Sequence, residues 1–399
     1  MKDLIAVRIL LPFLVISLIL VSCDNQEQEE ITVIDVVGNM NNTIDIKLSD
    51  IAETVQYIPL ETNSECLISK GNKIVTTKDY FFIADGKNPL FVFDHEGKFI
   101  RKIGAVGKGP GEFQNCNQFH VDEETEEVYV FNQKEFVVYS WNGAYISTVK
   151  FPFGATSYHR SSNGDFAFLQ SLMGPYSSTF KVFITNKALK VKGEISWEQK
   201  VNAAYSLSVG AQVQDWNNEI MAQIEFCDTI YAIKRSLLLP KIYLDFGNMR
   251  FTVDMLAVHD PVKLVSDIDN HIFSYDLATL NDIWGIKFSW KQNKYLGLLN
   301  PESNEIVFAS KIDTAMGGFI NDIDGGPGYF PSKRFKEDDW IVAIPAYNFQ
   351  NMYQNGQFEN TDLIYPNANK TLNKMASKLE ADDNPVLMLL KKKMDPTKW

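Results

Sequence analysis

Two stretches of the chain decide the fold: Val92-Phe-Asp-His-Glu-Gly-Lys-Phe-Ile100 and Val138-Tyr-Ser-Trp-Asn-Gly-Ala-Tyr-Ile146. They lie 46 residues apart, and each places a glycine turn before an aromatic residue and an isoleucine. Aromatic and β-branched residues on both sides of a glycine turn are typical of β-hairpins. Hairpins that recur with a period of about 40 to 50 residues are the signature of β-propeller blades.

Weaker copies of this pattern continue to about residue 345. Counting from Leu67 gives five clear units and a sixth, incomplete unit that begins near Phe319. A single blade cannot cover its own faces, so neighbouring blades must stack and the ring must close. We therefore predict an all-β, six-bladed β-propeller. A β-sandwich is the alternative fold, but two sheets do not explain the 46-residue recurrence.

The sixth unit needs strands from distant parts of the chain. Gly318–Asn321 and Trp340–Ile344 supply two of them, and Val55–Leu60 is a spare strand before the first unit. We predict that this N-terminal strand completes the last blade and closes the ring. Apolar residues at helical spacing in Ala368–Leu379 predict a short C-terminal helix within blade six, and Val386–Leu390 reads as a returning strand.

The composition fits one large globular domain or two medium ones. The 399 residues are 45% hydrophobic and 22% charged, which excludes a disordered or coiled-coil chain. The net charge is −12, so binding to a nucleic-acid backbone is not expected, because that requires a basic surface. The repeat favours one domain, because ring closure joins all six units.

The first 23 residues carry an export signal. Lys2 and Arg8 precede an apolar run, which ends in Leu20-Val-Ser-Cys23. A basic head followed by a short apolar core is typical of a secretory signal peptide, although an uncleaved membrane anchor is the alternative. The ending resembles a bacterial lipobox, which implies cleavage after residue 22 and lipidation of Cys23. Several acyl chains together hold a protein stably on a membrane.

The residues after Cys23 predict a solvated tether. Asp24-Asn-Gln-Glu-Gln-Glu-Glu30 is polar and acidic, so it buries nothing. The stretch also resembles the signal that sends lipoproteins of Bacteroidota to the outer face of the outer membrane; a plain linker is the alternative. The expected organisation is thus a signal peptide at 1–22, an acidic tether at 23–44 and the propeller at 45–399.

Four further motifs stand out along the chain: Gly107-Lys-Gly-Pro-Gly-Glu-Phe113, Asp228-Thr-Ile-Tyr231 with Pro240–Gly247, Asn321-Asp-Ile-Asp-Gly-Gly-Pro327 and Asp383-Asn-Pro-Val-Leu387. Together with the lipobox, they resemble the six-bladed β-propeller lipoproteins of Bacteroides and relatives, and the first of the four is shared with NHL-repeat propellers. The resemblance implies this fold and an envelope location, but it implies no defined activity.

The first of these motifs has a structural interpretation. Gly107, Gly109 and Gly111 permit positive φ angles, and Pro110 stiffens the turn. Glu112 is expected to cap backbone N–H groups, and Phe113 to plug the space between adjacent blades. A phosphate-binding loop is the functional alternative, but the Lys-Ser/Thr pair of a P-loop is missing.

The motif of the sixth unit offers oxygen ligands: Asn321, Asp322 and Asp324 precede Gly325 and Gly326. These oxygens allow a Ca²⁺ site, but the EF-hand spacing from Asp322 ends at Lys333 instead of a glutamate. A tight turn between strands explains the segment adequately.

Three histidines are expected near the innermost strands of blades two, three and five: His120, His159 and His271. Innermost strands line the central channel, so these side chains could converge on a zinc ion. No H-x-H or H-E-x-x-H pattern supports this interpretation, and satisfied channel histidines are the favoured alternative. We predict no cofactor, with calcium or zinc kept as alternatives.

Lipidation of Cys23 leaves Cys66, Cys116 and Cys227. Three cysteines without C-x-x-C spacing encode neither a disulfide framework nor a zinc ribbon. One disulfide is possible, and buried free thiols are the simpler interpretation.

The preferred hypothesis for function is a monomeric, lipid-anchored protein of the cell surface. It would bind a peptide, glycan or protein at a mouth of the propeller, where loops converge. Aromatic residues available for stacking are Tyr158, Tyr176, Tyr205, Trp216 and Trp284. The alternative is a metal-dependent lyase or hydrolase in the central channel that uses the three histidines, and a purely structural envelope role is a third possibility.

Overall fold

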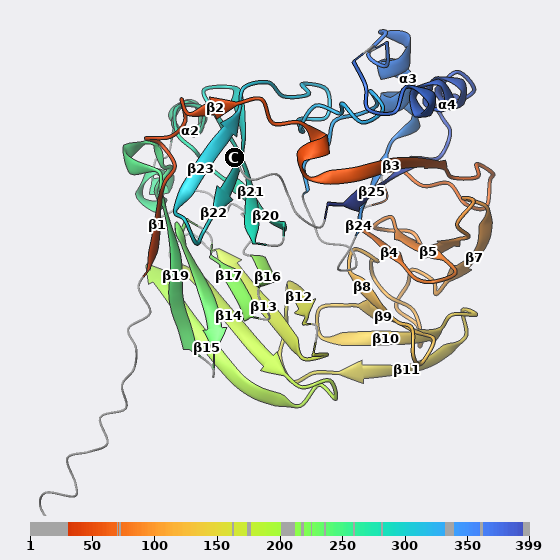
Figure 1. The fold of residues 1–399 in the computed structure, drawn as a ribbon. Coiled ribbons are helices and arrows are strands. Elements are labelled where there is room, and N and C mark those ends of the chain that lie inside the picture. Colours follow the sequence, from red (N-terminus) through yellow and green to blue (C-terminus); the bar gives the residue numbers. More distant parts are fainter. Residues whose placement is uncertain are drawn as a thin grey trace, which may run out of the picture. The chain divides into compact units, whose positions relative to one another are not determined.

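Six β-sheets surround the centre of the molecule (Figure 1). In five of them the innermost strand is the first of four consecutive strands, and the sixth sheet combines strands from both ends of the chain. The computed structural model describes residues 31–393, apart from residues 70, 72, 162, 174–176, 201–211, 217–218, 225, 235–236, 258–259, 281, 332–338 and 360–361. The predicted signal peptide, Cys23 and the acidic run after it lie outside the described residues. The all-β, six-bladed propeller predicted from the 46-residue repeat is confirmed.

Blades one to five each contain four consecutive antiparallel strands. Blade one is β4 (Lys73–Thr76), β5 (Phe81–Ala84), β6 (Leu90–Phe93) and β7 (Phe99–Ile103), and blade two is β8 (Phe119–Asp122), β9 (Glu127–Phe131), β10 (Glu135–Ser140) and β11 (Tyr145–Lys150). Blade three is β12 (Ser157–Arg160), β13 (Phe166–Met173), β14 (Ser177–Thr185) and β15 (Val191–Lys200). Blade four is β16 (Gln212–Trp216), β17 (Glu219–Gln223), β18 (Thr229–Lys234) and β19 (Leu237–Asp245), and blade five is β20 (Tyr275–Leu280), β21 (Ile283–Trp290), β22 (Asn293–Asn300) and β23 (Glu305–Ala309).

Blade six is built from both ends of the chain. Its strands are β24 (Asp339–Ile344), β25 (Val386–Lys392) and β3 (Ala52–Pro59), in that order. Leu387 pairs with Ile58, so the N-terminal strand completes the last blade as predicted. The prediction of a strand at Gly318–Asn321 is wrong. This segment makes isolated bridges, Ile320 with Lys47 and Phe319 with Tyr329, because it forms a separate hairpin beside the blade.

The N-terminal segment also adds strands to two other blades. β1 (Thr32–Asp35) pairs in parallel with β19 of blade four, and β2 (Thr43–Ile44) pairs in parallel with β23 of blade five. We expected a solvated tether over residues 23–44. Residues 32–44 instead belong to the propeller, because Ile34 and Val36 are fully buried against blade four.

Helices lie in the connections between strands. α2 (Pro261–Asn270) precedes blade five, while α3 (Ala346–Gln354) and α4 (Pro366–Ala376) connect β24 to β25. α4 confirms the predicted C-terminal helix, whose Leu372 and Ala376 are buried. Short 3-10 turns occur at η1 (Leu48–Asp50), η2 (Gly247–Met249) and η3 (Val253–Ala257). Within the described part of the chain, no helix combines the length and apolar character needed to cross a membrane.

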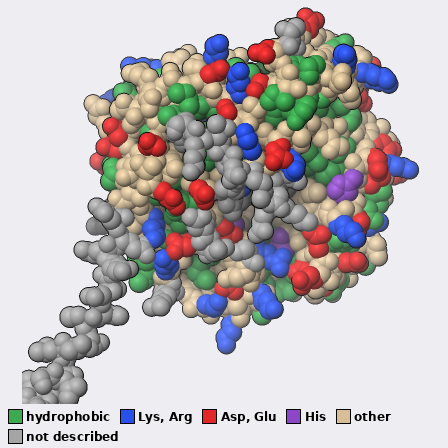
Figure 2. All heavy atoms as spheres, in the orientation of Figure 1, with side chains coloured by type: hydrophobic (Ala, Val, Ile, Leu, Met, Phe, Trp, Pro, Cys, Tyr) green, Lys and Arg blue, Asp and Glu red, His purple; other side chains and the backbone are tan. Residues whose placement is uncertain are grey.

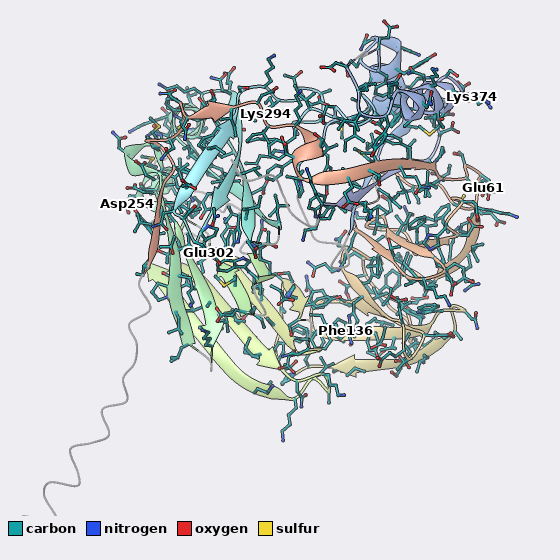
Figure 3. All side chains as sticks on the ribbon, in the orientation of Figure 1. Glu61, Phe136, Asp254, Lys294, Glu302 and Lys374 are labelled. Atoms are coloured by element: carbon teal, nitrogen blue, oxygen red, sulfur yellow. The ribbon has the colours of Figure 1, made fainter. Side chains whose placement is uncertain are left out.

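The core consists of apolar layers between neighbouring blades. The layer between blades two and three is aromatic: Phe136, which Figure 3 labels, packs against Phe131, Phe151, Phe166 and Phe168. The hydrophobic effect scales with buried apolar area, so these layers hold the blades in a fixed order. The rigid ring positions the ends of the innermost strands, where the candidate site lies.

Candidate functional site

The ends of three innermost strands carry charged side chains that link blade to blade. Arg160 at the end of β12 donates from Nη2 to Asp122 Oδ2 at the end of β8, at 3.0 Å. On the other side of β12, His159 Nε2 lies 3.1 Å from Asp215 Oδ1 of β16. We call Asp122, His159, Arg160 and Asp215 the charged mouth. Successive strand residues point to opposite sides, so His159 and Arg160 reach different neighbouring blades.

The charged mouth remains partly open to solvent. The side chains of Asp122, His159, Arg160 and Asp215 keep 21%, 23%, 33% and 17% of their surface exposed. The Arg160 guanidinium makes a charged hydrogen bond to Asp122. Burial acts to raise the pKa of Asp122, but the hydrogen bond from the Thr125 N–H, the Arg160 guanidinium and the Glu124 N–H together lower it. A guanidinium carries five N–H donors, so Arg160 retains donors for a further partner.

His120 lies beneath the mouth in the aromatic layer. Its ring stacks on Tyr129 with 4.4 Å between centroids, and its Nδ1 lies 3.3 Å from the Tyr158 hydroxyl. Burial lowers the pKa of His120 well below its usual value, and the positive charges of Arg160 and Lys73 lower it further. His120 is therefore a neutral packing residue at neutral pH.

The three histidines proposed as zinc ligands have separate surroundings. His120 and His159 lie on first strands as predicted, but His271 follows α2, and its Nδ1 lies 2.7 Å from the Asp267 carbonyl. His271 stands between α2 and β20, four residues before the innermost strand of blade five and not on that strand. Within the described residues, no three His, Cys, Asp or Glu side chains are arranged to hold a metal ion.

The Gly107–Phe113 loop is arranged as a rigid plug. Glu112 Oε2 accepts a hydrogen bond from the Gly109 N–H at 2.7 Å, and Phe113 is fully buried between blades one and two. The Tyr139 hydroxyl donates to the Gly111 carbonyl at 2.5 Å, and Gly111 has a φ of +73°. Both expectations for this motif, a cap by Glu112 and a plug by Phe113, agree with these contacts.

The motif of blade six forms a buried network that we call the blade-six clasp: Tyr57, Asn321, Asp324, Gly326 and Asn369. Asp324 Oδ1 accepts from Asn321 Nδ2 at 2.8 Å, from the Gly326 N–H at 3.0 Å and from the Tyr57 hydroxyl at 3.2 Å. Asn369 of α4 donates to the Asp324 carbonyl at 2.7 Å. Burial raises the pKa of Asp324, while these donors oppose the shift. The clasp joins the hairpin, the N-terminal strand and α4.

The remaining oxygens proposed for calcium are also engaged within the protein. Asp322 accepts from the Ser49 hydroxyl at 2.7 Å and from the Ser49 N–H at 3.1 Å. Asn321 Oδ1 accepts from the Ile323 N–H at 3.1 Å, and Gly325 has a φ of +76° that the turn requires. The motif thus explains how the ring closes, and its oxygens point to backbone and side-chain donors.

Sequence reasoning missed two buried polar residues that fix loops. Asn384 donates to the carbonyls of Glu61 and Cys66 at 2.6 and 2.7 Å and accepts from the Ile68 N–H. Arg250 pairs with Asp228 at 2.6 Å and donates to the Ile272 carbonyl. Asn384 and Asp228 both lie in the family motifs quoted above, and this position in a motif was the sequence signal that could have identified them. Arg250 lies outside these motifs.

The described aromatic residues that we expected to stack on a ligand take part in packing. Tyr158 packs in the aromatic layer, and Trp284 is fully buried. Trp216 is half-buried at the end of β16, with its ring edge-to-face on Trp284 at 5.2 Å. It follows Asp215, so its side chain points to the opposite side of the strand, toward blade five. Tyr176 and Tyr205 lie outside the described residues.

Cys66, Cys116 and Cys227 are free thiols, and the first two are buried. Burial raises the pKa of Cys116 to about 12, so its thiolate is scarcely populated at neutral pH.

Comparison with known proteins supports the fold. A solved structure titled "Putative exported protein" from Bacteroides fragilis has a TM-score of 0.66 at 17% identity, covering 91% of this chain and 100% of that one. A protein of unknown function from Bacteroides caccae has a TM-score of 0.36 at 12% identity, covering 68% of this chain and 81% of that one. No curated protein is significantly similar to the chain.

A family profile described as a domain of unknown function, DUF4934, matches residues 31–391. The match begins at residue 31, immediately before β1, and so includes the N-terminal strands that add to blades four, five and six. The chain belongs to the DUF4934 family.

Proposed function

We propose that this protein is an exported, lipid-anchored propeller that binds a peptide or protein partner at the charged mouth. The observation that carries the proposal is a set of partly exposed polar contacts between blades, the Asp122–Arg160 ion pair and the His159–Asp215 contact, at adjacent ends of the innermost strands. A polypeptide carries both signs of charge and hydrogen-bonding amides, so it can exchange with such pairs.

The rigidity of the surroundings supports a binding site. The mouth residues project from strand ends, and the aromatic layer under them fixes the neighbouring blades. Preorganised side chains lose little conformational entropy when a partner binds. On the face that Figure 2 shows, acidic and basic side chains are interspersed.

The binding proposal is tested with arrays of peptides and of glycans probed with the purified propeller. We expect peptide hits whose signal falls at least tenfold on Arg160→Gln and on Asp215→Asn. Lys374→Gln, an exposed change on α4 that Figure 3 labels at a distance from the mouth, is the matched control. Glycan hits without peptide hits would contradict a polypeptide partner, and hits unaffected by both mouth variants would contradict this location.

The location is part of the same proposal. The lipobox-like Leu20-Val-Ser-Cys23 supports lipidation of Cys23, and the acidic run after it supports display at the outer surface of the outer membrane. Radiolabelled palmitate should enter the wild-type protein and not the Cys23→Ala variant. Protease added to intact cells should then degrade the protein; full protection would contradict surface display.

A further inference from the structure

A cavity of about 300 Å³ lies on blade five, at the start of β20. The charged mouth lies at the ends of β8, β12 and β16, so this cavity is a separate site. Its walls are the last turn of α2, the segment leading into β20, and the end of β21. Sites for small ligands begin at about this volume. The side chains that carry the argument are Lys287, Trp290, Lys291, Asp269 and Asp276.

Two hydrogen bonds hold the walls of the cavity in place. The indole Nε1 of Trp290 donates to the Asn270 carbonyl at 2.9 Å, and the Lys291 N–H donates to the Asp269 carbonyl at 3.0 Å. They fasten the β21–β22 hairpin to the end of α2. The cavity is therefore formed before any ligand arrives, as is usual for small-molecule sites.

The hairpin turn at the rim carries backbone strain. Lys291 and Gln292 have φ angles of +47° and +63°, a region that usually holds Asn-Gly in two-residue hairpins. A residue other than glycine is strained in this region. The turn keeps Lys291 at the cavity, with its Nζ 4.5 Å from the centre of the Trp290 ring. Strain of this kind concentrates at functional sites.

Two ammonium groups meet beside the cavity. A Cβ placed on Gly317 would lie 3.2 Å from Lys294 Nζ and 3.7 Å from Lys287 Nζ. The two charges are therefore within about 7 Å of each other, a distance at which like charges repel. Figure 3 labels Lys294 on this side of blade five. Burial lowers the pKa of Lys287; Asp276 opposes the shift and Lys294 adds to it.

Three carboxylates lie around this group of lysines. Asp276 is the cross-strand neighbour of Lys287, and Asp269 lies at the rim. Asp313 lies near Gly317, where its carboxylate accepts the N–H groups of Ala315, Met316 and Gly328. The charges are therefore balanced in number, and the unusual feature is the close approach of the Lys287 and Lys294 ammonium groups. An anion placed between Lys287 and Lys294 would relieve their repulsion.

We propose that the blade-five cavity binds a small organic anion, of the size of a sugar acid, with its acid group between Lys287 and Lys294. Lys291 lies at the rim beside that group, and the body of the ligand packs toward Trp290 and the two serines of the wall, Ser274 and Ser289. The proposal does not depend on the partner proposed for the charged mouth.

The test is calorimetric titration of the full propeller with D-glucuronate, with D-glucose as the neutral analogue. We expect glucuronate to bind and glucose not to bind. Lys287→Met, which keeps the length of the side chain and removes the charge, should weaken the binding of glucuronate at least tenfold. Lys294→Gln, at an exposed position that does not affect folding, should weaken this binding about threefold, and Lys374→Gln should leave it unchanged.

Inorganic phosphate tests where the acid group sits. Phosphate should compete with glucuronate on the wild-type protein and lose that effect on Lys287→Met. Equal binding of glucose and glucuronate, or full affinity in both Lys287→Met and Lys294→Gln, would overturn the proposal. Binding of phosphate without any binding of glucuronate would also overturn it, because the cavity would then hold only a bare anion.

Discussion

The blade-six clasp and the charged mouth use similar residues in opposite ways. In the clasp, Asp324 is 1% exposed and accepts three hydrogen bonds, one of them from Tyr57, which lies 267 residues away in the chain. In the mouth, Arg160 pairs with Asp122 and His159 lies against Asp215, and these four side chains keep between 17% and 33% of their surface exposed. A buried and fully engaged carboxylate supports the fold, whereas a half-exposed ion pair contributes little to stability. The difference in burial identifies the clasp as structural and the mouth as available to a partner.

The largest expected effect belongs to the clasp. Asp324→Ala leaves the Tyr57 hydroxyl, the Asn321 amide and the Gly326 N–H without their acceptor, so it should lower the free energy of unfolding by about 3 kcal/mol. Urea denaturation measures this change. Asp254→Ala, a change at an exposed position of η3, is the control. A decrease in the free energy of unfolding below about 1 kcal/mol would show that the clasp does not hold the ring closed.

The second effect is a dependence of stability on pH that originates at His120. Its folded-state pKa lies well below 6.5, so the unfolded chain binds the extra proton first as the pH falls. The stability it contributes is complete above pH 6.5 and falls below it, toward the folded-state pKa, by at most about 1.4 kcal/mol per pH unit. Denaturation between pH 7.5 and about 5 should show this slope in the wild type and a shallower one in His120→Phe. Equal slopes would indicate that the pKa of His120 is the same in the folded and unfolded protein.

The third effect isolates one bond of the clasp. Tyr57→Phe removes the hydroxyl that donates to Asp324 and retains the ring that packs edge-to-face on Phe349 at 5.6 Å. It should therefore cost about 1 kcal/mol, less than Asp324→Ala. The double variant should cost no more than Asp324→Ala alone, because both changes remove the same bond. Additive losses in this cycle would show that the two residues act independently.

The smallest effect on stability is expected at the mouth. Arg160→Gln removes one partly exposed ion pair, so the free energy of unfolding should change by less than about 1 kcal/mol. Binding of a peptide partner should nevertheless be lost. Arg160→Gln thus affects binding more than stability, whereas the clasp variants act on stability. Thermal denaturation and peptide binding on the same preparation check both parts. A large loss of stability would contradict the distinction between the two regions.

Much of the fold could be predicted from local sequence. The hairpins of blades one and two depend on residues close together in the chain, and helical spacing was enough to find α4. The closing strand was predictable because a ring needs a partner for an incomplete blade. The parallel strands β1 and β2 were not predicted, because their partners in blades four and five lie more than 200 residues away in the chain. The bridge between Ile320 and Lys47 was missed for the same reason.

The candidate site was predictable only in part. The sequence determined the repeat, the number of blades and the positions of His120 and His159 on innermost strands, because these follow from hairpin chemistry and periodicity. It could not determine that Arg160 meets Asp122, that His159 meets Asp215 or that Lys287 meets Lys294. Each of these contacts joins side chains from different strands, and the first two cross between blades. Only the closed ring decided the two contacts that cross between blades, because the packing of one blade on the next sets which side chains come within a few ångströms.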